Sequence, residues 1–217
     1  MDAQKKSKLS DFWYYYKWHV IIAVVIAAIL AFTIRDCSHK VEPDVSVRGI
    51  LNAYVAEESR QALEQTLYDA GLIPDINADG KQNCMLQLLT VPAEVKSEQD
   101  MAVQMQITLG FAADDAVLYL IDEEFLELYE EQGIFQPLDV FAAQQTVPQE
   151  QLYVGPETGE VLGVSLQGNA LLEQCGMNTE TLYLAMRMIR QNEQDDPEVQ
   201  AMFDASEQIA AYLYQHR

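Results

Sequence analysis

The hexapeptide AVLYLI at residues 116–121 decides the fold class expected for this chain. It is a short, continuous apolar run that ends directly at Asp122. Runs of this length and composition are typical of a buried strand in a parallel sheet, which helices cover on both faces. We therefore expect an α/β domain with this strand in its interior.

Further strand and helix patterns alternate on both sides of this run. Strands are predicted at residues 45–54, 84–91 and 160–166, which are rich in β-branched and other apolar residues. Residues 181–189 fit either a strand or a helix, and residues 141–158 are expected to be irregular. Because strands and helices follow one another in turn, right-handed βαβ units are expected. The predicted fold is one three-layer α/β/α domain with a mostly parallel sheet.

Local signals mark the ends of the predicted helices, because caps and glycines act within a single turn of the chain. The predicted helices are residues 57–70, ended by Gly71; residues 123–132, capped by Asp122 and ended by Gly133; a helix capped by Ser97; and a helix that starts at Pro197 after the cap Asp196. Proline is favoured at the first helical position, which supports the start of the last helix.

Two of these helices carry an apolar stripe that is expected to face the core. After Ser97 the stripe consists of Met101, Met105, Leu109 and Ala112, which share one helix face. A methionine and leucine stripe of this kind usually belongs to a core rather than to a cofactor site. The stripe of the last helix consists of Val199, Met202, Phe203, Ile209, Ala210 and Leu213.

An aromatic block followed by an apolar run predicts a membrane anchor at residues 12–35. The run at residues 20–34 has no charged residue, and as a helix it would measure about 22 Å against a hydrocarbon core of roughly 30 Å. Trp18 and His19 extend it, and Lys17 can place its ammonium at the headgroups. The preceding tryptophans and tyrosines suit the interfacial belt of a bilayer.

The distribution of positive charge predicts how this anchor is oriented. Four lysines precede the apolar run, whereas only Arg35 and Lys40 follow it closely, so the N-terminus is expected in the cytoplasm. The predicted organisation is a basic cytoplasmic tail (1–11), a transmembrane anchor (12–35), a linker (36–44) and an extracytoplasmic α/β domain (45–217). The expected location is the cell membrane, with a single pass and the C-terminal domain outside.

Three other interpretations of the N-terminal segment are less favoured by its residues. A cleaved signal peptide needs small residues at its cleavage site, and Ala31-Phe32-Thr33 is a poor match. Processing as a lipoprotein at Cys37 needs small residues that the preceding positions lack. A buried core helix would not normally follow a row of aromatic and basic residues.

The charge of the chain is divided sharply between its two parts. Up to residue 40 there are six Lys/Arg and three Asp/Glu, whereas the remainder has seven against thirty-one, a net charge of −24. Nucleic acid and anionic lipid would be repelled, so neither is expected as a partner of the outer domain. The carboxylates either provide a solvated surface or, in part, chelate a divalent cation.

The segment DINADG at residues 75–80 resembles the opening of a calcium loop. Asp75, Asn77 and Asp79 place oxygen atoms at positions one, three and five, and the carbonyl of Lys81 can supply position seven. Position twelve is Leu86, where an EF-hand has glutamate, and a strand follows instead of a helix. The segment is therefore predicted to be either a modest, structural Ca²⁺ site or an ion-free turn rich in Asp and Asn.

Residues that usually support catalysis or disulfide bonds are sparse in this chain. The three histidines include His19 at the predicted anchor and His216 next to the C-terminus, and no nucleophile, zinc or phosphate-loop motif is present. We therefore expect no enzymatic activity. Three cysteines form neither a metal pattern nor a disulfide framework, although a bridge between Cys84 and Cys175 is left open.

Several segments resemble extracytoplasmic solute-binding proteins of the type II periplasmic-binding fold. Residues 115–124 (DAVLYLIDEE) and 133–139 (GIFQPLD) resemble a strand and the turn after it in that family. Residues 161–166 resemble a further strand, and residues 181–213 resemble the strand and helix that return to the first lobe. Residues 12–19 resemble the anchors of uncharacterised clostridial membrane proteins that carry such a domain.

The resemblance implies one lobe of that fold rather than two. The segment between Leu166 and Thr181 is far too short to hold a second lobe, so clamshell closure on a transported ligand is not expected. The expected function is a membrane-tethered extracytoplasmic binding or interaction module for a small molecule, peptide or protein. The alternative is an accessory subunit that docks another membrane or cell-wall protein, with calcium as a structural ion.

Ligands of open α/β sheets bind beyond the carboxyl ends of the strands. In the predicted domain, Tyr54, Asp122, Glu123 and Gln167 follow three of the strands at that end. We therefore expect these four residues near any recognition surface, although helix capping is a competing role for Asp122.

Overall fold

The computed structural model describes residues 18–19, 21–33, 43–91, 96–113 and 116–216, and it divides into the units Met1–Glu42 and Pro43–Arg217. The predicted basic tail (1–11), the aromatic block up to residue 17, the linker up to residue 42 and the pair Asp114/Asp115 lie outside the described residues. Each unit is considered by itself.

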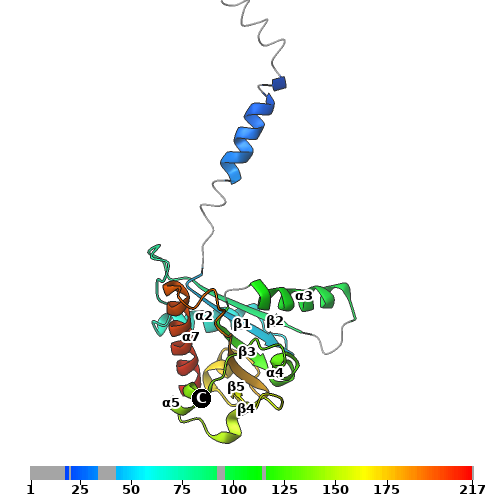
Figure 1. The fold of residues 1–217 in the computed structure, drawn as a ribbon. Helices are drawn as coiled ribbons and strands as arrows, with labels where there is room; N and C mark the ends of the chain where they lie inside the picture. Colours follow the sequence, from blue (N-terminus) through cyan, green and yellow to red (C-terminus); the bar gives the residue numbers. More distant parts are fainter. Residues whose placement is uncertain (1–17, 20, 34–42, 92–95, 114–115, 217) are drawn as a thin grey trace, which may run out of the picture. The chain divides into compact units, whose positions relative to one another are not determined.

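In the N-terminal unit, residues 18–19 and 21–33 are helical (Figure 1), and every described side chain on this helix is exposed. Its exposed residues include Trp18, Ile22, Val24, Ile29 and Phe32. Among the described residues, no helix combines the length and the apolar character needed to cross a membrane. This finding gives no support to the anchor predicted at residues 12–35.

The second unit contains one sheet of six strands in the order β2-β1-β3-β6-β5-β4. The strands are β1 (Val45–Leu51), β2 (Cys84–Thr90), β3 (Leu118–Asp122), β4 (Leu152–Val154), β5 (Val161–Ser165) and β6 (Leu182–Met186). β1 is parallel to β2 and β3, whereas β6 is antiparallel to β3 and β5, and β4 is antiparallel to β5. The α/β class is thus confirmed, and the sheet is mixed, since β4 and β6 run against the other strands.

The reversal at β6 follows from the short connection that precedes it. Between β5 and β6 the described chain forms only the short helix α6 (Ala170–Gln174), so it leaves β5 and enters β6 at the same end of these two strands. A strand that begins at the end where its neighbour finished must run antiparallel to that neighbour. Of the ambiguous residues 181–189, Leu182–Met186 form a strand and none forms a helix.

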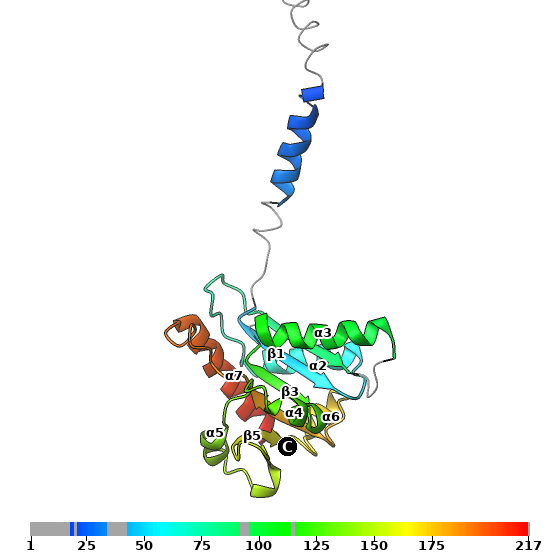
Figure 2. The same cartoon turned by 45° about the vertical axis from the view of Figure 1, so that its right-hand side comes forward.

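Helices cover both faces of this sheet. They are α2 (Glu57–Asp69), α3 (Glu98–Ala113), α4 (Glu123–Glu130), α5 (Asp139–Gln144) and α7 (Pro197–Gln215), in addition to α6. Successive residues of β3 enter two separate cores, because Leu118 and Leu120 lie in one and Tyr119 and Ile121 in the other. The first core includes residues of α2 and α7, and the second includes residues of α3 and α4, which gives three layers (Figure 2).

The prediction that residues 141–158 are irregular is wrong. This segment contains the end of α5, a 3₁₀ turn (Gln149–Gln151) and the edge strand β4. A strand of three residues is too short to show an alternating pattern. Its position is instead set by pairing with β5, where Leu152 lies opposite Val164.

Candidate functional site

Helix α3 lies on the sheet with a different face from the one predicted. Met101, Met105 and Leu109 are 56%, 65% and 59% exposed, and Ala112 is exposed as well, so the predicted core stripe is wrong. The fully buried residues of α3 are Ile107 and Gly110. Residues 101–113 include no charged side chain, so no charged face directs this part of the helix outward.

A close approach between α3 and β1 determines which face is buried. A Cβ atom at Gly110 would collide with the guanidinium of Arg48, which lies beneath the helix on β1. With Arg48 in this position, a residue larger than glycine would require the guanidinium or the helix to shift, so Gly110 permits the close approach of α3 to the sheet. This arrangement turns the stripe that contains Met101, Met105 and Leu109 toward the surface.

A groove of about 480 Å³ lies where α3 meets β1 and β2. It is lined by Arg48, Gln87, Ala102, Met105, Gln106, Leu109 and Gly110. Arg48 is only 4% exposed, and its Nη2 donates a hydrogen bond of 2.7 Å to Oε1 of Gln87. Burial lowers the pKa of Arg48, but an arginine keeps its charge in proteins. The groove therefore combines apolar walls with one cation and two amide groups.

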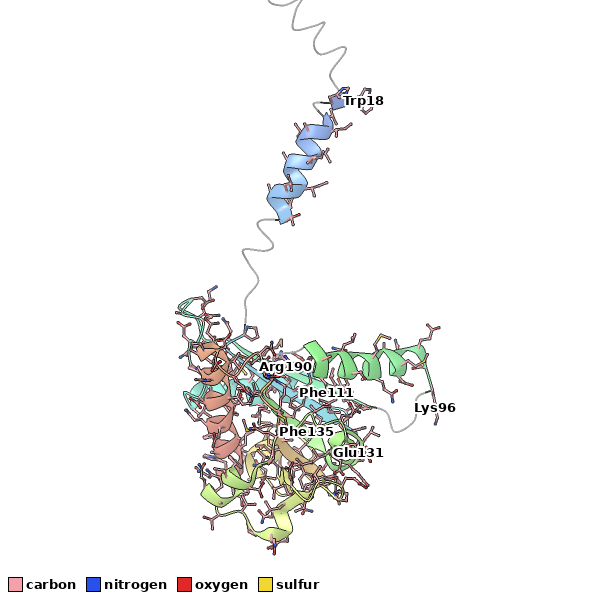
Figure 3. All side chains as sticks on the ribbon, in the orientation of Figure 1. Trp18, Lys96, Phe111, Glu131, Phe135 and Arg190 are labelled. Carbon is pink, nitrogen blue, oxygen red and sulfur yellow. The ribbon has the colours of Figure 1, made fainter. Side chains whose placement is uncertain are left out.

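Beneath this groove the second core is aromatic and borders several arginines. Figure 3 labels Phe111 of α3 and Phe135 in this core. The ring centroid of Phe111 lies 6.1 Å from that of Phe135 and 5.7 Å from that of Tyr119. Burial raises the pKa of Tyr119, and its hydroxyl has no hydrogen-bond partner among the residues that the structure describes. The charges of Arg48, Arg187 and Arg190 oppose that rise in pKa. This concentration of arginine contrasts with the acidic composition of the domain.

The neighbouring strand β2 forms one edge of the sheet and has no charged residue or proline. In a parallel strand, every second residue forms its backbone hydrogen bonds to the same neighbouring strand. Val91, just beyond β2, donates its N–H to the carbonyl of Leu51 in β1, so the backbone groups of the odd-numbered residues of β2 face β1. The intervening residues Leu86, Leu88 and Thr90 thus direct their backbone N–H and C=O groups to the open edge. Edge strands in natural proteins are usually protected by charge, proline or a covering segment.

We call the exposed apolar stripe of α3 together with β2 the α3–β2 surface. From β2, Met85, Gln87 and Leu89 share the sheet face that α3 covers, since their partners Ser46, Arg48 and Ile50 lie on that face. Met85 is 40% exposed. The surface can therefore bury apolar side chains and pair its strand with another backbone, and this chemistry fits a polypeptide partner.

The strand-end residues predicted to bind a ligand are placed less favourably. Asp122 is 3% exposed, and its carboxylate accepts hydrogen bonds from the backbone of Asn52 at 2.7 Å and from the hydroxyl of Thr181 at 2.8 Å. It stands at the N-cap position of α4 without capping it through its side chain, so the predicted cap is wrong. The reason is tertiary: the donors from Asn52 and Thr181, which precede and follow other elements, take up the carboxylate oxygens that would otherwise cap the helix.

The other three residues of the predicted ligand site are exposed. Tyr54 is 80% exposed, and Glu123 and Gln167 are exposed at the ends of β3 and β5. No hydrogen bond joins one of these side chains to another among these described residues. The structure therefore places the four residues at the predicted end of the sheet but brings together no shared binding group.

The predicted calcium loop is folded around its own side-chain oxygens. Asp75 accepts hydrogen bonds from the backbone of Asp79 and Gly80 at 3.1 and 3.0 Å, Asn77 accepts one from Asp79 at 2.9 Å, and Asp79 accepts one from Lys81 at 2.8 Å. Within the described residues, no group of three His, Cys, Asp or Glu side chains is placed to hold a metal ion. Two carboxylates and one amide on this loop would form only part of a calcium shell.

Asp44 holds this loop against the sheet, which sequence reasoning missed. Its buried carboxylate accepts hydrogen bonds from the backbone of Ile76 at 2.7 Å, Asn77 at 3.2 Å and Asn83 at 2.8 Å. The sequence placed Asp44 at the end of the linker, because nothing local distinguishes it from a polar linker residue. Arg48 was missed for a similar reason, since one arginine in a predicted strand has no pattern to mark it.

Comparison with known proteins assigns this chain to no family. No family model matches the sequence, and no curated protein matches it either. The relation to solute-binding proteins that residues 115–124 and 133–139 suggest therefore stays a prediction.

Proposed function

We propose that this protein is a membrane-tethered extracytoplasmic interaction module, a single-lobe relative of solute-binding proteins, that binds a protein partner through the α3–β2 surface. The observation that carries the proposal is the exposed stripe of Met101, Met105 and Leu109 beside an uncharged, open sheet edge. Of the two functions expected from the sequence, the docking subunit agrees better with this geometry than the small-molecule binder.

The choice of a protein partner rests on the size and composition of the surface. Large apolar side chains scattered over a surface need no explanation, but a contiguous apolar patch usually marks an interaction site. Here three such side chains follow one helix face at intervals of four residues, and Met85 of β2 adds a fourth. A small polar solute would leave most of this stripe uncovered.

The membrane tether is supported by the sequence and by the exposure of the N-terminal helix. Residues 21–33 expose apolar side chains around the whole helix, and a helix that is apolar on all sides requires lipid or protein around it. The aromatic residues from 12 to 18 and the lysines before them suit a cytoplasmic membrane interface. The acidic outer domain would then face the exterior.

The docking proposal can be tested in membranes with a photo-crosslinking amino acid at position 105. Met105 lies in the centre of the stripe, whereas Val140 of α5 is 70% exposed outside it and provides a matched control. Position 105 of the full-length protein should give a discrete cross-linked protein that position 140 does not give. Equal cross-linking at both positions, or none at either, would contradict the proposal.

The tether can be tested independently with a tag fused after Arg217. An antibody or a membrane-impermeant reagent should reach this tag in intact cells, and the protein should sediment with membranes after a carbonate wash. A tag that becomes accessible only after permeabilisation, or a freely secreted protein, would rule out the proposed topology.

Calcium as a structural ion is the second part of the proposal. It is supported by the loop at residues 75–81, in which oxygen atoms of Asp75, Asn77 and Asp79 all turn inward onto one short segment. A bound ion would replace none of the contacts of Asp44, which already join the loop to the sheet. Affinity would be modest, because the loop supplies only two carboxylates.

A further inference from the structure

We propose that the partner of the α3–β2 surface is a second copy of this chain. Two copies related by a two-fold axis would pair their β2 strands antiparallel, which joins the two sheets into one, and would place their α3 helices side by side. The inference rests on the proposed docking function and names the occupant of that surface.

The open edge of β2 provides the first argument. Among the described residues, no strand pairs with the backbone groups of Leu86, Leu88 and Thr90 that face away from β1. A two-fold axis would bring an identical antiparallel strand to meet them. At the first residue of β2 the outward-facing N–H already has a partner, because Cys84 donates it to the hydroxyl of Tyr68 at 2.9 Å. The part that remains open is therefore the uncharged central and C-terminal part of the strand.

Charge provides the second argument, and it favours a copy over a different protein. Residues 41–217 have a net charge of −24, so two copies repel each other at most orientations. Neither β2 nor residues 101–113 of α3 include a charged side chain, so these segments add no like-charge repulsion between copies. A basic partner would be attracted to the acidic surface elsewhere and would find no complementary charge here.

The shape of the surface provides the third argument. The groove beside β2 has walls of Met105 and Leu109, and the neighbouring turn of α3 presents Met101. With the two α3 helices antiparallel, the methionines of one copy face the groove of the other. Methionine adapts its shape to irregular gaps. Each methionine can therefore line the groove of its own copy and also pack into the groove of the other copy.

Sedimentation of residues 43–217 tests this inference, because that unit contains both hydrophobic cores. At micromolar concentration the wild-type domain should sediment with twice its monomer mass. Met105→Glu places a carboxylate in the centre of the interface, and Thr90→Pro removes an N–H that faces the open edge without removing one that faces β1. Each variant should weaken dimerisation at least about tenfold, since an unpaired charge or a missing strand hydrogen bond is costly to bury.

Val140→Glu is the matched control, because it adds the same charge at an exposed site outside the surface. It should leave the dimer unchanged, and circular dichroism should show that all three variants keep the fold. A monomeric wild-type domain at 100-fold higher concentration would overturn the inference, as would a dimer that both Met105→Glu and Thr90→Pro leave intact.

The same measurements separate this inference from the proposed function. A monomeric domain whose full-length form still cross-links another protein from position 105 would refute the second copy but leave the docking function in place. A monomeric domain with no cross-link at position 105 would refute both. A wild-type dimer that cross-links to itself from position 105 supports both.

Discussion

Helices α3 and α7 are the two longest helices of the domain, and they relate to the sheet in opposite ways. They lie on different sides of strands β1 and β2 in Figure 1. α7 buries Ala205, Ile209, Ala210 and Leu213 in the first core, whereas α3 fully buries only Ile107 among its large side chains. One helix is part of the core, and the other offers most of its apolar surface to a partner.

The difference shows what fixes the orientation of a helix. α7 has acidic and amide residues opposite its apolar stripe, so only one face can be buried without cost. Residues 101–113 of α3 have no charged side chain, and the close approach of Gly110 to Arg48 accompanies its observed orientation. Stability should therefore depend on the apolar residues of α7, and association on those of α3.

The largest expected effect is on α7. Ile209→Ala should reduce the free energy of unfolding by about 2–4 kcal/mol, because it opens a cavity in a fully buried position. Met105→Ala in α3 should change it by less than about 0.5 kcal/mol when both are measured by urea denaturation of residues 43–217 at a concentration where the domain is monomeric. A similar loss for both variants would contradict the proposed division of roles.

The second effect concerns the contact that orients α3. Gly110→Ala should destabilise the domain by about 1–2 kcal/mol, because the added methyl group collides with Arg48, although alanine favours helices by about 1 kcal/mol. In the background of Arg48→Ala the same substitution should be neutral or stabilising, and a double-mutant cycle measures this coupling. Additive effects of the two substitutions would show that Arg48 does not determine the orientation of the helix.

The third expected effect is a pH dependence of the stability of the domain, which arises from Glu193 close to α7. Burial alone would raise the pKa of Glu193. The hydrogen bonds that it accepts from Arg187 at 2.7 Å and from the backbone of Arg190 lower it by more, so the pKa of Glu193 lies below the usual 4.5. A carboxyl with a lowered pKa in the folded state stabilises it above about pH 4.5, and that contribution is lost as the pH falls.

Arg187 also lies over the ring of Phe203 in α7 at 5.4 Å, so protonation of Glu193 should weaken the attachment of this helix. Glu193→Gln should therefore lower the melting temperature at pH 7 and leave it almost unchanged at pH 3. The corresponding measurement with Glu98→Gln, an exposed residue in the first turn of α3, should show no such difference. Equal pH dependence in both variants would contradict this assignment.

The smallest effect is expected from calcium. Millimolar Ca²⁺ should raise the melting temperature of residues 43–217 by a few degrees relative to chelator, since the stabilisation is small when the free ion concentration is close to the Kd of a weak site. Asp75→Ala combined with Asp79→Ala should abolish the difference, whereas Asp69→Ala in α2 should not. An unchanged melting temperature with and without calcium in the wild-type domain would remove the proposed ion.

Much of the fold could be predicted from the sequence, because its signals are local. The run at residues 116–121 is fully buried as predicted, and Asp196 caps α7 by accepting a hydrogen bond from the N–H of Glu198 at 2.9 Å. Ser97 caps α3 in the same way through Asp100 at 3.1 Å. In each case the interacting groups lie within one helical turn, so their spacing in the sequence is sufficient evidence.

The candidate site could be predicted only in part. The sequence marked the stripe of Met101, Met105 and Leu109 correctly as a unit, but assigned it to the core because that is the usual place for such a stripe. Arg48 and the open edge of β2 could not be found, since both depend on which strands become neighbours. Local capping was expected for Asp122, and a contact across 59 residues to Thr181 took its place.

By itself the sequence determined the α/β class, the position of most strands and helices, and the contrast between a basic, aromatic N-terminal segment and an acidic domain. Only the tertiary structure decided the strand order, the reversal at β6 and the face of α3 that meets the sheet. The physical reason is range: hydrophobic period, caps and charge act between neighbours in the chain, whereas close packing at Gly110 and the pairing of β2 depend on segments that folding brings together.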